Sequence, residues 1–225
     1  MEEERGRSAR LLEEEAGARS QGYRTIAGLD EVGRGCLAGP VYAGAVVLEP
    51  EAEILGLDDS KRLSPVVRQA LDGRIRRRAR GVAVGLASPA EIDALGIARA
   101  NELAMRRALE GLREAGVEPD LLLLDAVHLP GVWVEQRSYV RGDQRVAAIA
   151  AASIVAKVAR DRFMDLLHRL FPYYGFDGHR GYGTAVHLAA LRRHGPSPVH
   201  RLTFDRVLPL DARWTRRDRR RVDAA

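Results

Sequence analysis

Residues 26–48 read IAGLDEVGRGCLAGPVYAGAVVL, and this segment carries the clearest signal of the fold. Two segments, 23–29 (YRTIAGL) and 41–48 (VYAGAVVL), have the composition of β-strands. Between them lies GRGCLAGP, whose three glycines and one proline favour a turn. We therefore predict an antiparallel hairpin. A further apolar run, Leu121–Leu124, is typical of a central strand that is covered on both faces.

Helices and strands alternate in the rest of the chain. Further strands are predicted at 81–87 and 132–139, and helices at 66–80, 89–115, 146–170 and 185–194. This alternation indicates an α/β fold with a mixed sheet. We predict one domain over residues 23–207, preceded by a charged N-terminal tail (1–22) that lies outside the fold and followed by a basic C-terminal tail (208–225).

The composition is that of a globular protein, with 46% hydrophobic and 30% charged residues. The longest apolar run, Val146–Ala156, is about half the roughly 20 residues that a membrane span needs. The first fifteen residues are acidic, whereas a secretory signal is basic and then apolar. The single cysteine, Cys36, excludes an internal disulfide framework. We expect a cytoplasmic protein that does not bind membranes.

The positive charge of the chain is almost entirely arginine. The isoelectric point is about 9.8, yet only two of the 36 basic residues, Lys61 and Lys157, are lysines. Two explanations are open: either a compact ammonium group is required at these two positions, or the lysines are chance survivors of a compositional preference for arginine. The net charge of +5 is too small to decide whether the chain binds nucleic acid.

Carboxylates follow the apolar strands at the points where those strands end. Asp30 and Glu31 follow TIAGL, and Asp125 follows LLLL. A charge at the edge of a buried core is costly unless it is compensated. A divalent cation such as Mg²⁺, which takes oxygen ligands, is one possible partner, and an arginine or a helix terminus is another.

Three further features of these acids leave alternatives open. Asp143, in RGDQR, precedes a long helix and could be its N-cap, while Asp161 could pair with Arg160 or Arg162. Adjacent strand residues point to opposite faces, so Asp30 and Glu31 can share a site only if the strand ends or bulges there. The following Gly33 favours such an end.

The segment Gly33–Gly35 (GRG) could bring backbone amides close to a sugar or phosphate oxygen, or could serve only as a hairpin turn. The chain contains no GxxxxGK[ST], HExxH or GxSxG motif. These absences disfavour P-loop nucleotide triphosphatases, the commonest zinc peptidases and the α/β-hydrolases. The six histidines are scattered and suggest no site by themselves.

Six segments together resemble the ribonuclease HII family. They are residues 26–48, DDSKRLS (58–64), LLLLDAV (121–127), GDQRVAAIAAASIVAKVARDR (142–162), HRGYGT (179–184) and HRLTF (200–204). They occur in the family's order and extend from about Tyr23 to Phe204. Both lysines fall inside matching segments, which favours a specific role for each.

The resemblance implies a ribonuclease H-like fold, with a mixed β-sheet flanked by helices and a helical C-terminal portion. It implies hydrolysis of the RNA strand of RNA–DNA hybrids and incision of DNA duplexes 5′ of embedded ribonucleotides, with two Mg²⁺ or Mn²⁺ ions as cofactors. By motif position, Asp30, Glu31, Asp125 and Asp143 would be the catalytic, metal-binding carboxylates. The residues that would contact the substrate are Gly33, Arg34, Gly35, Lys61 and Tyr182. We expect a monomer.

The related type HIII enzymes usually have Ser and Lys where Val32 and Arg34 stand here, and carry an additional N-terminal domain. Residues 1–22 are too few for that domain, which favours HII. Arginines at 141, 145 and 180 replace lysines that are frequent in the family, and the planar guanidinium could change substrate affinity.

Two other functions are consistent with parts of the sequence. A nucleic-acid-binding protein without catalytic activity could use RIRRRAR (74–80) and the arginine-rich segment 211–225, but would have no need of the acidic residues. Another nuclease or a recombinase could share the fold, but the GRG and GYGT segments argue against this alternative.

Overall fold

The computed structural model describes residues 2–50 and 54–208, with side chains from Gly6 onward. Contacts divide these residues into two compact units. Unit 1 takes in the chain up to Val32 together with 42–86 and 101–159, and unit 2 takes in 33–41, 87–100 and the chain from Arg160 onward. The chain passes between the two units several times, so no single linker in the sequence separates them. The sequence predicted one domain over residues 23–207. Residues 209–225, most of the predicted C-terminal tail, lie outside the described residues.

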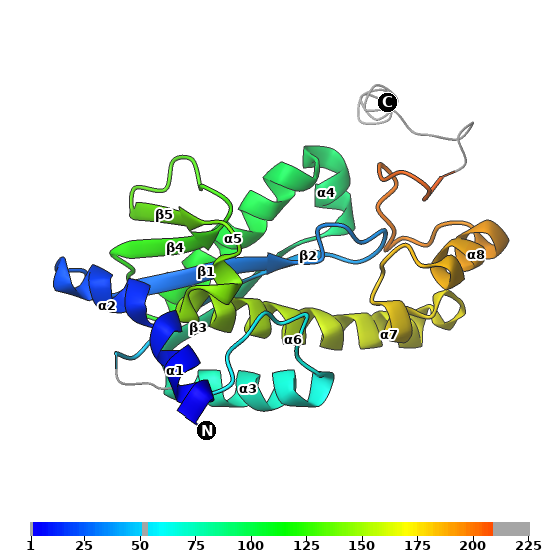
Figure 1. Cartoon of the computed structure of the whole chain (residues 1–225). Helices are drawn as coiled ribbons and strands as arrows, with labels where there is room; N and C mark the ends of the chain where they lie inside the picture. The colour runs from blue at the N-terminus through cyan, green and yellow to red at the C-terminus, as the bar shows by residue number, and fades with distance from the viewer. Residues whose placement is uncertain (1, 51–53, 209–225) are drawn as a thin grey trace. The chain divides into compact units, whose positions relative to one another are not determined.

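Unit 1 is built on a mixed five-stranded sheet with the order β3-β2-β1-β4-β5 (Figure 1). The strands are β1 (Ile26–Val32), β2 (Val41–Leu48), β3 (Ala79–Ala87), β4 (Leu121–Asp125) and β5 (Glu135–Tyr139). β1 runs antiparallel to β2 and parallel to β4, and β4 runs parallel to β5. The predicted strand pair and the central position of the LLLL strand are both confirmed.

Helices cover both faces of this sheet, and glycines in the strands allow them to approach closely. A side chain at Gly28 or Gly44 would collide with the backbone of α6 (Ala147–Leu170), at Ala148 and Ala152 respectively. A side chain at Gly85 would collide instead with α5 (Ile97–Glu114). Because alternate strand residues point to opposite faces, Val82 and Val84 pack into the core on the other face of β3.

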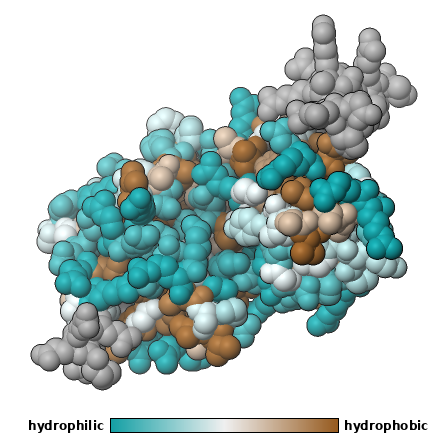
Figure 2. Space-filling view, turned by 45° about the vertical axis from the view of Figure 1, so that its right-hand side comes forward, coloured by the Kyte–Doolittle hydropathy of each residue, from teal (hydrophilic) through white to brown (hydrophobic). Residues whose placement is uncertain are grey.

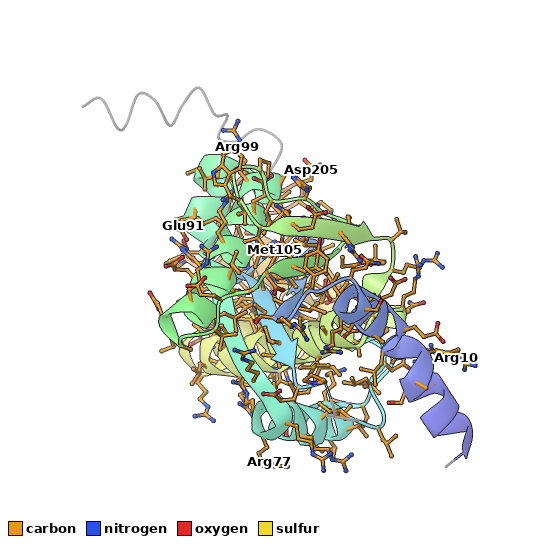
Figure 3. All side chains as sticks on the ribbon, turned by 90° about the vertical axis from the view of Figure 1, so that its left-hand side faces the viewer. Arg10, Arg77, Glu91, Arg99, Met105 and Asp205 are labelled. Carbon is orange, nitrogen blue, oxygen red and sulfur yellow. The ribbon has the colours of Figure 1, made fainter. Side chains whose placement is uncertain are left out.

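The helix α3 (Pro65–Arg78) belongs to the same layer as α6, because Leu71 and Ile75 share a core cluster with residues of α6. Ser64 caps it by accepting a hydrogen bond from the Val67 amide at 3.3 Å, as the Ser-Pro sequence predicts. Met105 of α5 is fully buried, whereas Arg77 of α3 lies at the surface (Figure 3).

Residues 2–20 form two helices, α1 (Glu2–Leu11) and α2 (Glu13–Ser20), that belong to unit 1. The sequence predicted a charged tail outside the fold. Instead, Leu11 and Ala18 are buried in core clusters of the unit. Glu15 is also buried, and its Oε1 accepts a hydrogen bond from the Ala148 amide at 2.8 Å, so it caps the first turn of α6. The high density of surface charge hid these few inward-facing positions.

Unit 2 contains the last turns of α6 together with α4 (Pro89–Leu95), α7 (Phe176–His179) and α8 (Ala185–His194). Its core includes Leu37, Met164, Phe176 and Leu191. The sequence predicted a continuous helix over 89–115, but Gly96 adopts φ +80° and ends α4, and α5 begins at Ile97. A left-handed glycine is a common end for a helix.

The face of the molecule drawn in Figure 2 is mostly hydrophilic, with smaller apolar areas. Within residues 2–50 and 54–208, no helix combines the length and apolar character that crossing a bilayer requires.

Candidate active site

Asp30 and Asp125 lie side by side on two neighbouring parallel strands, at the point where the pairing of β1 with β4 ends. The register pairs Leu29 of β1 with Leu124 of β4, so the next residue on each strand is one of these two acids. Both acids occupy the sheet face that α6 covers, because Asp30 follows Gly28 by two residues and strand side chains alternate. The carboxyl ends of parallel strands are where α/β sheets place ligands.

Asp30 is a buried carboxyl group in a crowded acidic environment. Only 5% of the residue is exposed. Burial raises the pKa of Asp30 well above its ordinary value, and the negative charges of Glu31 and Asp125 raise it further. A hydrogen bond from Ser153 on α6 opposes this shift, and the Ser153 hydroxyl lies 2.9 Å from that of Ser60. Nothing in the sequence distinguishes Ser153, which lies in an alanine-rich helix, as a partner of Asp30.

Glu31 does not lie at the end of its ladder with β2. The register continues through Glu31 paired with Ala43 and Val32 paired with Tyr42, without a bulge. Alternation alone would direct Glu31 away from Asp30, yet the charge of Glu31 is the largest electrostatic cause of the raised pKa of Asp30, ahead of that of Asp125, so the Glu31 carboxylate lies close to Asp30. The predicted strand end is found on the β4 side, where pairing stops at Leu29, but not on the β2 side, where the ladder continues to Val32.

Asp143 is brought toward Asp125 by the turn that precedes α6. The Gly142 amide donates to Asp125 Oδ1 at 2.7 Å, and Asp143 follows in the 3-10 turn Gly142–Gln144. Burial raises the pKa of Asp143 to about 6, with contributions from the charges of Asp59 and Asp125. Asp143 is not the N-cap of the long helix, because α6 begins at Ala147 and Glu15 accepts the Ala148 amide.

Lys61 lies close to the same group of acids. Its positive charge counteracts the rise in the pKa of Asp143, and its backbone amide donates to Asp59 Oδ1 at 2.9 Å. Gln144 also donates to Asp59 Oδ2, at 3.4 Å. Asp59 is therefore a further buried acid beside Asp143, and its place in the DDSK motif does not distinguish it from the neighbouring Asp58.

The carboxylates of unit 1 have the chemistry of a divalent cation site. Buried, mutually repelling oxygen donors are stabilised by a hard cation such as Mg²⁺. In the described part of the chain, however, no three His, Cys, Asp or Glu side chains are grouped closely enough to hold a metal ion by themselves. Mg²⁺ commonly uses one or two carboxylates together with waters and substrate phosphates, so the donor set fits a site that the substrate completes.

The GRG segment belongs to unit 2 and is not a simple hairpin turn. Residues 33–40 make an eight-residue excursion between β1 and β2 in which Cys36, Leu37 and Ala38 are buried. Gly33 has φ +92°, and a Cβ there would lie 2.2 Å from Arg160 Nε. Arg34 and Gly35 are exposed. The segment thus presents its polar tip to solvent while its remainder is part of a packed core.

Tyr182 belongs to the same unit and is 40% exposed. Burial of the remainder raises the pKa of its hydroxyl, as does a hydrogen bond with Cys36. Its backbone amide donates to the His179 carbonyl at 2.9 Å, and its carbonyl lies 2.9 Å from His187 Nδ1. Unit 2 therefore brings the GRG segment and Tyr182 together through Cys36.

Two buried histidines, His187 and His200, connect the backbone at Tyr182 to the backbone at Ser197. The Ser197 amide donates to His200 Nδ1 at 2.9 Å, so in neutral His200 the hydrogen is on Nε2. That Nε2–H donates to His187 Nε2 at 3.0 Å, and His187 Nδ1–H then donates to the Tyr182 carbonyl. Both rings must be neutral for this chain of hydrogen bonds to form.

Stability should therefore fall in acid through these histidines. Burial and the neighbouring His187 lower the pKa of His200 to about 4, from 6.5. Between these values the unfolded chain binds a proton that the folded chain excludes, so the free energy of unfolding decreases as pH falls, by up to about 1.4 kcal/mol per pH unit. Denaturant unfolding from pH 7 to 4 should show a smaller decrease for His200→Asn than for the unmodified chain. An equal decrease in the free energy of unfolding for both proteins would contradict the conclusion that His200 is buried in its neutral form.

Other polar residues that the sequence singled out have structural partners. Asp161 pairs with Arg180, with Oδ1 and Nε 3.9 Å apart, a partner that the sequence did not indicate. Arg76 of the basic segment 74–80 pairs with Asp72 at 3.0 Å, and Arg80 donates to Thr25. The arginine-rich segment 211–225 lies outside the described residues.

Known proteins resemble this chain over most of its length. The family model described as Ribonuclease HII matches residues 27–207. Ribonuclease HII of Desulfitobacterium hafniense (strain DSM 10664 / DCB-2) is 51% identical over 194 residues, covering 86% of this chain and 74% of that protein. The crystal structure of ribonuclease H2 from Pyrococcus horikoshii OT3 matches with a TM-score of 0.70 and 24% identity, covering 82% of this chain and 95% of that one. Bst-RNase HIII in complex with Mn²⁺ matches with a TM-score of 0.66 and 19% identity, covering 84% and 70% respectively.

These structural matches confirm the predicted ribonuclease H-like fold, a mixed sheet flanked by helices with a helical C-terminal portion. Ribonucleases HII are metal-dependent endonucleases that act on RNA–DNA hybrids. Because the family model covers residues 27–207 and a curated relative is 51% identical over most of both chains, this chain belongs to the ribonuclease HII family.

Proposed function

We propose that this chain hydrolyses the RNA strand of RNA–DNA hybrids and also incises DNA duplexes 5′ of single embedded ribonucleotides. The products would carry 5′-phosphate and 3′-hydroxyl ends. The observation that most directly supports this function is the adjacency of Asp30 and Asp125, directly after the last paired residues of β1 and β4 and beside Asp143 and Lys61. This arrangement places carboxylates that can bind a metal ion beside the Lys61 ammonium group, which can contact a phosphate of the substrate.

In this proposal Asp30, Glu31, Asp125 and Asp143 hold two divalent ions, Mg²⁺ or Mn²⁺. When bound, such ions lower the pKa of the attacking water and stabilise charge on the departing 3′-oxygen. The Gly142 amide fixes the orientation of Asp125, and the Ser153 hydroxyl does the same for Asp30. Lys61 contacts a phosphate of the substrate. Mn²⁺ bound to the similarly folded Bst-RNase HIII supports this choice of metal.

Recognition of RNA is assigned to unit 2. The 2′-hydroxyl is the group that distinguishes a ribonucleotide from a deoxyribonucleotide at the same position. Gly33, Arg34 and Gly35 contact the sugar and phosphate at the RNA–DNA junction, and the exposed face of Tyr182 packs against the ribose.

The proposal is tested with an RNA–DNA hybrid whose RNA strand is labelled. We expect cleavage with Mg²⁺ or Mn²⁺, no cleavage with EDTA, and no cleavage of the corresponding DNA duplex under any of these conditions. Folded protein that leaves the hybrid intact with both metals would contradict the proposal, and retained binding without cleavage would favour a nucleic-acid-binding function.

Replacement of Tyr182 tests its packing role. Tyr182→Phe keeps the ring and loses the hydroxyl that bonds to Cys36, whereas Tyr182→Ala loses both. If packing dominates, Phe should reduce kcat/KM on a single-ribonucleotide duplex by less than about threefold and Ala by roughly tenfold or more, since stacking is worth about 1–3 kcal/mol. A larger loss for Phe than for Ala would count against packing. Thermal unfolding of both variants is the control.

A further inference from the structure

Two arginines are completely buried in unit 2 and donate hydrogen bonds to residues 33–40, the loop that carries the GRG motif. Arg160 on α6 and Arg201 in the C-terminal segment are both 0% exposed. Within the described part of the chain, neither guanidinium forms an ion pair with a carboxylate. Burial of such a charge is costly unless its N–H groups are satisfied by good acceptors. The identity of those acceptors therefore shows what the arginines do.

Every acceptor of Arg201 is a backbone carbonyl in the segment 33–40. Its Nε donates to Gly39 at 3.0 Å, its Nη1 to Arg34 at 2.8 Å and its Nη2 to Gly33 at 2.7 Å. The Arg201 amide also donates to the Leu37 carbonyl, at 2.9 Å. One side chain thus fixes the carbonyls of both residues that begin the GRG motif.

Arg160 holds the other end of the same segment. Its Nε donates to Pro40 at 3.1 Å and its Nη2 to Ala38 at 3.2 Å. Its Nη1 donates to the Arg180 carbonyl at 2.9 Å, two residues before Tyr182. Arg160 therefore ties the loop that carries GRG to the loop that carries Tyr182. Gly33 leaves the space through which this side chain passes, because a Cβ would overlap it.

The consequence for the loop is a fixed orientation of its peptide groups. The two arginines turn five carbonyls of residues 33–40 inward, those of Gly33, Arg34, Ala38, Gly39 and Pro40. A peptide plane whose carbonyl points inward directs its N–H the other way. The plane of the Arg34 carbonyl carries the Gly35 amide, and within the described residues this N–H makes no hydrogen bond. It is left for a ligand oxygen.

We propose that Arg160 and Arg201 are positioning residues that set the geometry of ribonucleotide recognition, by holding the GRG loop with its carbonyls inward and its Gly35 amide outward. This inference rests on the proposed role of GRG in contacting the sugar and phosphate. Neither arginine touches the substrate. Each acts through the loop, and the planar fork matters because it reaches three carbonyls at once, which the single ammonium of lysine cannot do in the same geometry.

The charge of the two guanidinium groups adds a second effect. Burial lowers the pKa of Arg201 to about 10, and the nearby Arg160 charge contributes to the decrease, so Arg201 remains protonated at neutral pH. Two positively charged guanidinium groups are therefore buried next to residues 33–40, the loop that is proposed to bind a phosphate. Arg201→Lys retains the charge and loses the fork, and it therefore separates the geometric effect from the electrostatic one.

The experiment compares binding of a DNA duplex containing one ribonucleotide with binding of the matched all-DNA duplex, in EDTA so that neither is cut. For Arg201→Lys we expect the preference for the ribonucleotide duplex to fall roughly tenfold or more, since hydrogen bonds to charged groups are the stronger ones. Affinity for the all-DNA duplex should stay within about twofold. In steady-state cleavage, KM should rise by more than kcat falls, because the carboxylates of unit 1 are unchanged.

Leu191→Val is the matched control, because Leu191 is buried in the core of unit 2 and its apolar side chain forms no hydrogen bond, so the loss of one methylene lowers stability and leaves the bonds from Arg160 and Arg201 in place. It should keep the full preference. Thr203→Val is a milder test that avoids a folding failure: it removes the hydroxyl that donates to Asp93 at 2.5 Å and loosens the segment carrying Arg201. Its preference should fall by about two- to threefold, whether or not Arg201→Lys folds.

The outcomes separate the two proposals. If the unmodified chain prefers the ribonucleotide duplex and folded Arg201→Lys or Thr203→Val keeps that preference in full, the positioning role is wrong while the proposed function stands. If the unmodified chain shows no preference at all, the proposed function itself fails, and the positioning role fails with it.

Discussion

Asp30→Asn should abolish cleavage and leave the protein at least as stable as before. We expect kcat/KM on a hybrid to fall by about 10³-fold or more, which corresponds to roughly 4 kcal/mol of transition-state stabilisation. Stability should not fall, because the carboxyl group is buried and repelled by Glu31 and Asp125, and the neutral amide relieves both costs. Functional residues often carry such a cost in stability. Cleavage assays and denaturant unfolding at pH 8 measure the two effects.

The matched control is Asp72→Asn on α3. Asp72 is also buried, but it pairs with Arg76 at 3.0 Å and has no place in the proposed site. This change should lower the unfolding free energy by about 1 kcal/mol and leave cleavage intact. Asp30→Asn protein that still cleaves the substrate, or whose free energy of unfolding is clearly lower than that of the unmodified chain, would contradict the proposed role of Asp30.

Gly33→Ala should severely destabilise unit 2, whereas Gly35→Ala should not. Gly33 has φ +92°, and its added Cβ would lie 2.2 Å from Arg160 Nε. The backbone strain alone costs about 1–2 kcal/mol, and displacement of a buried guanidinium adds to it, so we expect a total of about 3 kcal/mol or more. At Gly35 an added Cβ would meet nothing within 4 Å. Denaturant unfolding should separate the two variants clearly.

The same pair of variants distinguishes folding from recognition. Gly35→Ala should fold normally and lose affinity for a ribonucleotide-containing duplex, because the added methyl group occupies the place where the substrate sugar is proposed to lie. Equal stability of Gly33→Ala and the unmodified chain would show that Arg160 does not need the space at Gly33.

The sequence was sufficient for the parts of the fold that depend on local pattern. Period and composition identified the β1–β2 pair and the apolar β4 strand, and Ser64 with Pro65 marked the start of α3. The position of Asp125 at the end of β4 followed from its place after an apolar run, whereas β1 continues past Asp30 to Val32. The adjacency of Asp30 and Asp125 depends on the parallel pairing of β1 with β4, which is a long-range feature that no local pattern encodes.

What the sequence missed was determined by tertiary contacts. Glu15 looked like one more charge in an acidic segment, yet it is buried and caps α6. Arg160 and Arg201 were two among many arginines, and only the carbonyls around them reveal their role. His187 and His200, thirteen residues apart, form a hydrogen-bonded pair that their spacing did not indicate. In each case a polar residue gains its function from partners that are distant in the chain.

Cleavage of an end-labelled DNA duplex containing a single ribonucleotide, mapped to the nucleotide beside an all-DNA duplex, tests the proposed chemistry and the proposed recognition together. We predict one metal-dependent incision on the 5′ side of the ribonucleotide, leaving a 3′-hydroxyl and a 5′-phosphate, and no incision of the all-DNA duplex. Incision at another position, equal cutting of both duplexes, or no cutting by folded protein with Mg²⁺ or Mn²⁺ would contradict the proposed function.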